Sequence, residues 1–259
     1  MHIDPVVSHP AQPGIIPFAF PSLPMVRAAF TTRIGGSSEG PFSQGNISFD
    51  VADTRERVQA NRLALRARCG FDELTEAKQV HGTALLSVDG PLAPDVEADG
   101  LITTAPGRAL CIKTADCQPV LLAHTSGQAV AALHVGWRGN RANFPATGLA
   151  RFCATYDLAP EEVLAVRGPS LGPGCSEFVH FDREWGPEFA SYYDSGRKTV
   201  DLWRMTEDQL CSAGLRREHI FRLDLCTFSL PSFFFSYRRE RTCGRQAGLI
   251  WIHKGAPCS

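Results

Sequence analysis

The sequence predicts an α/β (α+β) protein folded as a single compact unit. Short β-rich runs separated by Gly, Pro and Asp fill residues 75–136, helical patterns return from the 140s, and two further strand-like runs follow. Strands and helices are therefore interspersed, which favours a mixed fold over an all-β or all-α fold. The chain has 259 residues, 44% of them apolar, and no internal repeat or linker-like stretch, so one domain is the simplest organisation.

The N-terminal part of the chain predicts an arm, a strand, a loop and a helix. Residues 1–25 are rich in proline and lack a hydrophobic period, so we expect an N-terminal arm, irregular or forming an edge strand, ahead of a single catalytic domain at 26–259. Residues 26–33 predict a strand that runs into a Gly/Ser-rich loop, which either binds a ligand or only turns. A helix is predicted between Asp53 and Gly70, because Asp53 can cap the first amides and Glu56 follows in capping-box spacing.

The rest of the chain alternates between the two kinds of pattern. Runs rich in Val, Ile, Leu and Thr and bounded by turn residues predict strands, whereas apolar residues at helical spacing predict helices. We predict strands at 76–81, 84–89, 99–105, 109–114, 119–124, 128–135, 219–225 and 247–253, and helical segments at 148–156, 160–162, 182–193 and 206–213.

The charge balance excludes a basic, nucleic-acid-binding protein. Lys and Arg number 26 and Asp and Glu 27, so the formal net charge is −1 and offers no global attraction for nucleic acid or anionic lipid. No apolar stretch approaches the ~20 residues of a membrane span, and the first thirty residues lack the pattern of a secretory signal. We expect a cytoplasmic protein with no nucleic-acid or membrane partner, in which most of the nine cysteines are reduced.

Three polar motifs interrupt the apolar strands, at His81, Cys117 and His134. Each lies where a predicted strand gives way to a loop. One thiolate and two imidazoles suit Zn²⁺ and leave a fourth tetrahedral position for water or substrate. The spacings of 36 and 17 residues match no short-range zinc signature, so each His can also have a structural role and Cys117 can be an inert buried thiol.

Residues beside these motifs carry further candidate chemistry. Asp116 can orient an imidazole, act as a general base or bind a substrate hydroxyl, but it can equally cap a loop. Trp137 and Arg138 suit the stacking of a ring and the binding of an anion, or else form a core Trp with a surface Arg. The Gly/Pro-rich loop 168–175 either approaches a ligand or only connects, and the Arg- and aromatic-rich segment 233–245 either binds phosphate or forms a solvated basic face.

Taken together and in order, these blocks resemble a known family. The blocks FTTRIGG, KQVHGT, TADCQPVLL, HVGWRG, GPSLGPGC, LCT and FFSYRR with a following GR extend from about residue 28 to 252. They resemble the polyphenol oxidase, or laccase-domain, family, also labelled multifunctional purine nucleoside phosphorylase and peptidoglycan editing factor. The resemblance implies a four-layer α/β/β/α sandwich with mixed sheets, and a zinc site whose His, Cys and His fall on His81, Cys117 and His134.

The resemblance also implies several activities. Family members are associated with phosphorolysis of adenosine, inosine, guanosine and methylthioadenosine, with adenosine deamination, with a peptidoglycan-editing amidase, and with phenol oxidation. A multicopper oxidase needs around ten histidines, many in H-x-H pairs, whereas this chain has eight and no such pair, so we set true laccase chemistry aside. Cu²⁺ could still replace Zn²⁺ at the site. Two departures from the family pattern, Ser176 and Cys243, concern the substrate pocket and not the metal ligands.

These observations lead to one expected function and two alternatives. We expect a zinc-dependent purine nucleoside phosphorylase with adenosine deaminase activity, whose partners are a nucleoside and phosphate. The alternatives are a Cys-His amidase, in which Cys117 is the nucleophile and His134 the base, and a non-enzymatic zinc-binding protein. The expected catalytic residues are Cys117, His134, His81 and Asp116, and the candidate substrate or phosphate ligands are Arg33, Asn46, Trp137, Arg138, Tyr237 and Arg238.

Overall fold

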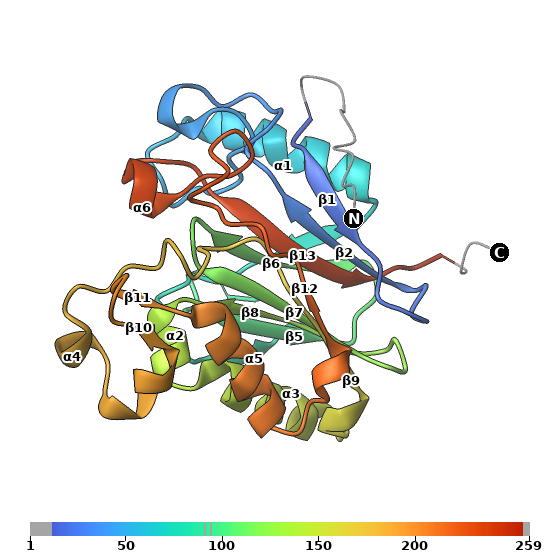
Figure 1. Ribbon diagram of the computed structural model, residues 1–259. Coiled ribbons are helices and arrows are strands. Elements are labelled where there is room, and N and C mark those ends of the chain that lie inside the picture. Colours follow the sequence, from blue (N-terminus) through green and yellow to red (C-terminus); the bar gives the residue numbers. More distant parts are fainter. Residues whose placement is uncertain (1–11, 91, 94, 256–259) are drawn as a thin grey trace.

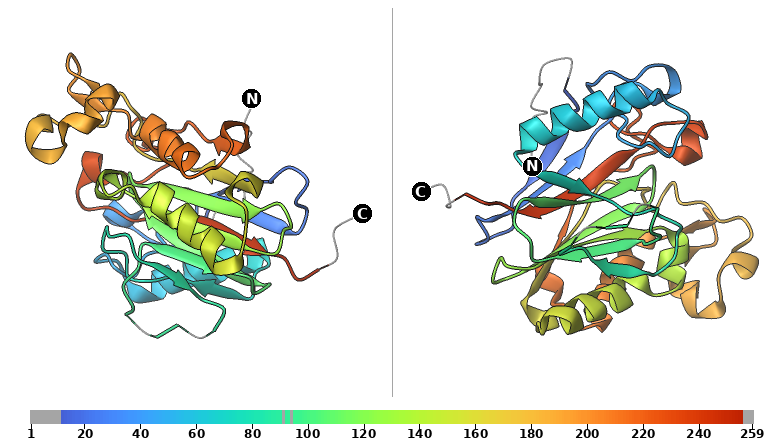
Figure 2. Two further views of the ribbon diagram at one scale, coloured as in Figure 1. Left: turned by 90° about the horizontal axis from the view of Figure 1, so that it is seen from below. Right: turned by 180° about the vertical axis from the view of Figure 1, so that it is seen from behind.

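The computed structural model describes residues 12–90, 92–93 and 95–255, and it shows the expected four layers (Figure 1). Helix α1 (Arg55–Cys69) covers one face of a five-stranded sheet, and a six-stranded sheet packs against the other face. Helices α3 (Phe144–Tyr156) and α5 (Leu202–Ser212) cover the outer face of the six-stranded sheet, as the turned views in Figure 2 also show. The predicted α/β/β/α sandwich is therefore confirmed.

Both sheets are mixed. The five-stranded sheet is antiparallel except at its β6–β3 edge, and the six-stranded sheet is antiparallel except at its two outer pairs, β12–β9 and β5–β4. In sheet order the first comprises β1 (Ile15–Phe18), β2 (Val26–Thr31), β13 (Gln246–Ile252), β6 (Arg108–Thr114) and β3 (Glu73–Thr75). The second comprises β12 (Ile220–Arg222), β9 (Val163–Arg167), β7 (Gln118–His124), β8 (Val130–Val135), β5 (Gly100–Thr103) and β4 (Leu85–Ser87).

Three apolar cores separate the four layers, and successive side chains of a strand enter the cores on its two faces in turn. In β8, Val130 and Ala132 belong to the core between the two sheets, whereas Ala131 and Leu133 belong to the core beneath α3 and α5. Because successive side chains of a strand point to opposite faces, His134 faces the other sheet. The direction in which the His134 side chain points is thus set by strand register.

Helix α1 ends as predicted but begins differently. Gly70 caps its C-terminus with a left-handed φ of 72°, a conformation that glycine adopts without strain. The N-cap is Thr54, not Asp53. The carboxylate of Asp53 instead accepts hydrogen bonds from the amide of Thr54 and the side chain of Asn46, both at 2.8 Å. The prediction that Asp53 caps the helix is therefore wrong by one residue.

Most predicted strands are confirmed, and one is wrong. Residues 76–81 form no strand, and Lys78 alone makes an isolated bridge to Glu97. The predictions at 182–193 correspond to a short helix, α4 (Phe181–Glu184), and a 3-10 helix, Pro187–Tyr192. Strand β9 and the short helices α2 (Trp137–Arg141) and α6 (Tyr237–Glu240) were not predicted. Residues 1–11 of the expected arm lie outside the described residues. Residues 15–18 form an edge strand, β1 (Ile15–Phe18).

A small aromatic cluster lies beside the sandwich, at the end occupied by α2 and α6 (Figure 1). It joins the segment of α4, β10 (Tyr193–Asp194) and β11 (Thr199–Val200) to α5 and to the start of α2. Trp185 lies among the rings of this cluster, 5.3 Å from Phe178 and 5.8 Å from Trp137 between ring centroids. In the described part of the chain, no helix is both long and apolar enough to cross a membrane.

The packing of α1 generates a stability prediction with an internal control. Leu65 is fully buried in the core under α1, whereas Leu63, two residues earlier on the same helix, is 54% exposed. We expect Leu65→Ala to lower the free energy of unfolding by ~2–5 kcal/mol, through lost burial and the cavity left behind. Leu63→Ala should change it by less than about 0.5 kcal/mol. Urea unfolding measures both, and equal losses would contradict the assignment of the buried face.

Candidate metal centre and cleft

The topology brings three of the predicted residues together at one end of the sandwich. The chain leaves the five-stranded sheet at the end of β6 and enters the six-stranded sheet at β7, with Asp116 and Cys117 in the crossing. His134 lies near the end of the neighbouring strand β8, opposite Pro119. His81 lies in the loop that precedes β4. Residues far apart in the sequence thus meet at the strand ends on one end of the sandwich.

His81, Cys117 and His134 form a cluster of metal-type ligands. One ligand atom from each lies within 4.8 Å of the others. The two imidazole rings meet edge to face, with centroids 4.9 Å apart. Gly136 leaves the space that this contact needs, since a Cβ there would lie 2.9 Å from Cys117 Sγ and 3.3 Å from His81 Cδ2. The close approach explains the glycine of the HVG motif.

Asp99, which the sequence analysis missed, positions both histidines. This residue has no exposed surface, and its carboxylate accepts a 2.7 Å hydrogen bond from His134 Nδ1. The same carboxylate accepts the amides of His81 at 2.9 Å and Gly82 at 2.7 Å, which holds His81 in its left-handed conformation, φ 60°. With Nδ1 engaged, Nε2 of His134 is the nitrogen left for Cys117 or a metal. In the sequence, Asp99 resembles an ordinary turn residue before a strand, so no local pattern marks it.

Cys117 and His134 stabilise each other's charged forms. Burial by itself raises the pKa of the Cys117 thiol, but the charge of His134 and hydrogen bonds with His134 and His81 lower that pKa to about 6. Burial acts to lower the pKa of His134, yet the thiolate and Asp99 raise it to about 9. Asp99 keeps a lowered pKa despite its burial, because His134 and the loop amides stabilise the carboxylate. Without metal, the pair is therefore a thiolate and an imidazolium at neutral pH.

Asp116 connects three segments around the site. Its carboxylate accepts hydrogen bonds from the Thr227 hydroxyl and the Arg238 amide, both at 2.7 Å, and its carbonyl accepts the Leu171 amide at 2.8 Å. Among the roles considered for Asp116, orienting an imidazole falls to Asp99 instead. Asp116 does line the cleft beside Cys117.

A cleft of about 510 Å³ opens over the cluster. Its aromatic and apolar wall includes Trp137, Phe178, Leu202 and Tyr237, and its cationic groups are Lys113, Arg138, Arg238, Arg241 and Arg245. Lys113 is paired with Asp50. The guanidinium of Arg138 stacks on Trp137 at 4.4 Å and that of Arg241 lies 5.4 Å from the Tyr237 ring, and neither forms an ion pair within the described chain. The lining therefore carries an excess of positive charge.

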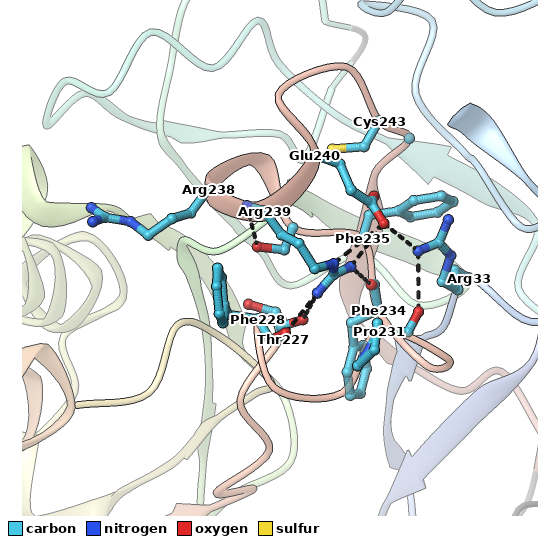
Figure 3. A network of polar contacts seen from close by, with 12 residues as sticks. Arg33, Thr227, Phe228, Pro231, Phe234, Phe235, Arg238, Arg239, Glu240 and Cys243 are labelled. Carbon is cyan, nitrogen blue, oxygen red and sulfur yellow. Dashed lines mark hydrogen bonds and ion pairs between the residues drawn. The ribbon is translucent and has the colours of Figure 1, made fainter. Parts of the chain in front are cut away.

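Four of the six predicted substrate ligands line this cleft, and Arg33 and Asn46 do not. Arg33 donates to Glu240 at 2.8 Å and to the Pro231 carbonyl at 3.1 Å (Figure 3). Asn46 is fully buried and accepts the amide of Arg245 at 2.9 Å. Both residues thus support the loops behind the cleft.

The segment that carries Arg238 is held by its neighbour Arg239. The Arg239 guanidinium donates to the carbonyls of Thr227, Phe228 and Phe234 at 2.7–2.8 Å. Figure 3 shows Arg238 pointing away from this network. Adjacent arginines in the RR motif therefore have different roles: one organises the loop, and the other reaches the cleft.

The two departures from the family pattern lie in different surroundings. Ser176 is buried at the cleft wall, and its hydroxyl has no hydrogen-bond partner among the described residues. Cys243 is buried outside the lining, and its carbonyl accepts a 2.8 Å hydrogen bond from Arg245. Only Ser176 directly alters the cleft.

The electrostatics of Cys117 can be tested in metal-free protein. We expect alkylation of Cys117 by iodoacetamide to be half-maximal near pH 6, fast above this pH and lost below it as the thiolate is protonated. Asp99→Asn removes a charge that raises the pKa of His134, so the pKa of Cys117 should rise toward the ordinary ~8.5. Mass spectrometry of the digest measures this, with Cys211, whose pKa burial raises, as internal control. A wild-type midpoint near ~8.5 would contradict the ion pair.

Comparisons of sequence place the chain among known proteins. The family pattern described as "Multi-copper polyphenol oxidoreductase laccase" matches residues 27–253. A Shigella flexneri relative named "Purine nucleoside phosphorylase YfiH" is 33% identical over 236 residues, covering 88% of this chain and 94% of the relative. A Xylella fastidiosa relative named "Purine nucleoside phosphorylase" is 37% identical over 250 residues, covering 90% and 95%.

Solved structures agree with the sequence comparison. YlmD from Geobacillus stearothermophilus superposes with a TM-score of 0.81 at 29% identity, covering 90% of this chain and 94% of that protein. A hypothetical protein YfiH from Bacillus licheniformis superposes with a TM-score of 0.82 at 26% identity, covering 94% and 97%. The family pattern spans most of the chain, and the relatives match over nearly their whole length. The chain therefore belongs to the multi-copper polyphenol oxidoreductase laccase family.

Proposed function

We propose that this protein is a zinc-dependent purine nucleoside phosphorylase that also deaminates adenosine. The observation that carries the proposal is the ligand cluster of His81, Cys117 and His134 at the floor of a cleft with aromatic and cationic walls. A purine ring and a phosphate are the two chemical groups that such walls bind best. The names of the relatives from Shigella and Xylella support the choice of nucleosides as substrates.

The donor set fits a catalytic zinc ion. One thiolate and two imidazoles are borderline-soft ligands of the kind that Zn²⁺ prefers, and three protein ligands leave a position for water or substrate. His134 has the Asp99 partner that metal-binding histidines usually require. When bound, zinc would supply a Lewis acid that lowers the pKa of water and stabilises developing negative charge. Cu²⁺ would fit the same three donors.

For phosphorolysis, the residues of the cleft would bind the phosphate and orient the nucleoside. A phosphate oxygen forms a bond to the anomeric carbon while the bond from that carbon to the purine breaks, and the bonding electrons pass to the base. Arg138 and Arg238 would hold the phosphate, because both line the cleft and charged forks bind phosphate through paired hydrogen bonds. Trp137 and Tyr237 offer faces on which the purine can stack.

For deamination, water replaces phosphate as the nucleophile. It adds to the purine carbon that bears the amino group, and ammonia leaves after it gains a proton. Asp116 is our candidate for moving that proton, because it lines the cleft and each carboxylate oxygen keeps a second lone pair beyond its one hydrogen bond. Phosphorolysis and deamination would therefore share the base site and differ in the nucleophile.

A second candidate function rests on a chain of polar contacts in which Cys117 interacts with His134, and His134 in turn with Asp99. A thiolate beside an imidazolium that is in turn held by a carboxylate is the arrangement of a nucleophilic cysteine hydrolase. In this alternative, a Cys-His amidase editing peptidoglycan precursors, Cys117 attacks an amide carbonyl and His134 protonates the leaving amine. Metal would then block the nucleophile, so the two functions predict opposite effects of chelation.

Phenol oxidation is not our proposal. In the part of the chain that the structure describes, His81, Cys117 and His134 form the single group of three or more metal-type ligands. Multicopper chemistry requires several copper ions held largely by histidine. A single copper ion at this site would at most oxidise phenols in protein that holds copper in place of zinc.

The function can be tested with adenosine, inosine and methylthioadenosine and protein of known metal content. We expect base release to require phosphate, to yield ribose 1-phosphate, to stop on chelation and to return with added Zn²⁺. Full activity after complete metal removal would refute the zinc mechanism. Hydrolysis of a muropeptide amide by the same metal-free protein would instead support the Cys-His amidase.

The phosphate role of Arg138 has a matched control on the same short helix. Arg138→Lys keeps the charge but loses the fork, so we expect phosphorolysis to fall roughly thirty- to a hundredfold, or ~2–3 kcal/mol, with a higher phosphate requirement. Deamination should fall much less, because it uses no phosphate. Arg141→Lys, also on α2 but outside the cleft lining, should leave both rates unchanged. Equal falls in ribose 1-phosphate and inosine for Arg138→Lys would assign Arg138 to nucleoside binding or site structure.

A further inference from the structure

Two cysteines on separate segments beside the cleft, Cys175 and Cys226, share one hydroxyl group. Their sulfurs lie 3.3 Å and 3.4 Å from Ser229 Oγ, so both border the same oxygen atom. The main chain keeps the segments together: Ser170 pairs with Cys226 in an isolated bridge, and the Gly172 amide donates to Cys226 Sγ at 3.3 Å. The sulfurs are therefore neighbours although the residues are far apart in the sequence.

The two thiols are partly accessible and differ in acidity. Both residues are half-buried. Burial raises the pKa of either thiol, but hydrogen bonds from Ser229 and from the Gly172 amide leave the pKa of Cys226 below its ordinary value. The pKa of Cys175 stays raised, by burial and by the adjacent Cys226. A more acidic thiol beside a protonated one is the arrangement in which the first reacts with an oxidant and the second resolves the product.

We propose that Cys175 and Cys226 are a redox modification site, which a peroxide converts into a reversible disulfide. The Cys226 thiolate attacks one peroxide oxygen, the O–O bond breaks, and the departing oxygen leaves as water, so that Cys226 becomes a sulfenic acid. The sulfur of Cys175 then attacks that sulfur, an S–S bond forms, the S–O bond breaks and a second water leaves. Two thiols lose two electrons and two protons, and one peroxide gives two waters. A small dithiol reverses the reaction.

The disulfide would cross-link two segments that shape the cleft. Cys175 precedes Ser176, whose buried side chain is part of the lining. Cys226 precedes Thr227, whose hydroxyl holds Asp116. Oxidation would therefore fix the Gly/Pro-rich loop 168–175 against the segment that positions Asp116. The cross-link also restricts the unfolded chain, so the oxidised protein should melt at a higher temperature.

Tryptic mapping tests the proposal on the full chain. Cys175 and Cys226 fall in tryptic peptides 168–183 and 223–238, each with a single cysteine, so a link between them is unambiguous. After brief hydrogen peroxide treatment, quenching with catalase and blocking of remaining thiols, we expect these two peptides to appear joined. The joined species should vanish on treatment with dithiothreitol. Its yield across a series of glutathione redox buffers should follow a single midpoint.

Three variants serve as controls. Cys175→Ser and Cys226→Ser should each abolish the joined species and the rise in melting temperature. Cys211→Ser, at another half-buried cysteine, should preserve both. Wild-type protein in which both thiols remain blocked as single peptides after peroxide treatment overturns the proposal, as does oxidation of Cys226 beyond sulfenic acid with Cys175 still free. The mass measurement on the wild type stands even if a variant does not fold, and it does not depend on the reaction in the cleft.

Discussion

The hydrogen bonds of the buried Asp99 carboxylate are the contacts on which the candidate metal centre depends. A carboxylate removed from water is costly unless donors surround it, and here the His134 ring and the amides of the His81 loop supply them. One group therefore sets the orientation of one imidazole and the backbone conformation of the other. The acidity of Cys117 follows from the same contact, because Asp99 favours the charged form of His134.

The sandwich explains why the site lies at its end. Between the sheets, side chains are apolar and packed, so polar ligands can gather only where the strands finish and loops can supply hydrogen bonds. The crossing from β6 to β7 carries Cys117 to this end, and the segment after β8 contributes Gly136 and, from the start of helix α2, Trp137 and Arg138. The five-stranded sheet contributes Lys113 and Thr114 to the cleft. The fold thus supplies a rigid floor, and the loops supply the groups that contact ligands.

The fold and the grouping of His81, Cys117 and His134 could be predicted from the sequence because local patterns and ordered motifs carry them. Helix α1 follows from its helical pattern and terminal glycine. The direction of His134 could not be predicted, because both faces of β8 are buried and the strand reads as a continuous apolar run. Arg33 was nominated by its motif, yet its partner Glu240 is 207 residues away, and only tertiary structure reveals that pairing.

Other differences have similarly local causes. Residues 76–81 have the composition of a strand but find a β partner at Lys78 alone. Asp99 was overlooked because a single carboxylate before a strand has the same sequence pattern as an ordinary turn residue. Its partners are 17 to 35 residues away. Such a group becomes recognisable only through its burial and the donors that converge on it.

Asp116 shows how one side chain can obscure the interpretation of mutagenesis. It holds Thr227, the Arg238 amide and, through its carbonyl, Leu171, while also lining the cleft. A variant that lost turnover would therefore not identify a proton donor, because the same change would also remove the hydrogen bonds that hold the Thr227 hydroxyl and the Arg238 amide. Assigning a chemical role there requires evidence that the surrounding conformation has survived, such as unchanged ligand affinity alongside the lost rate.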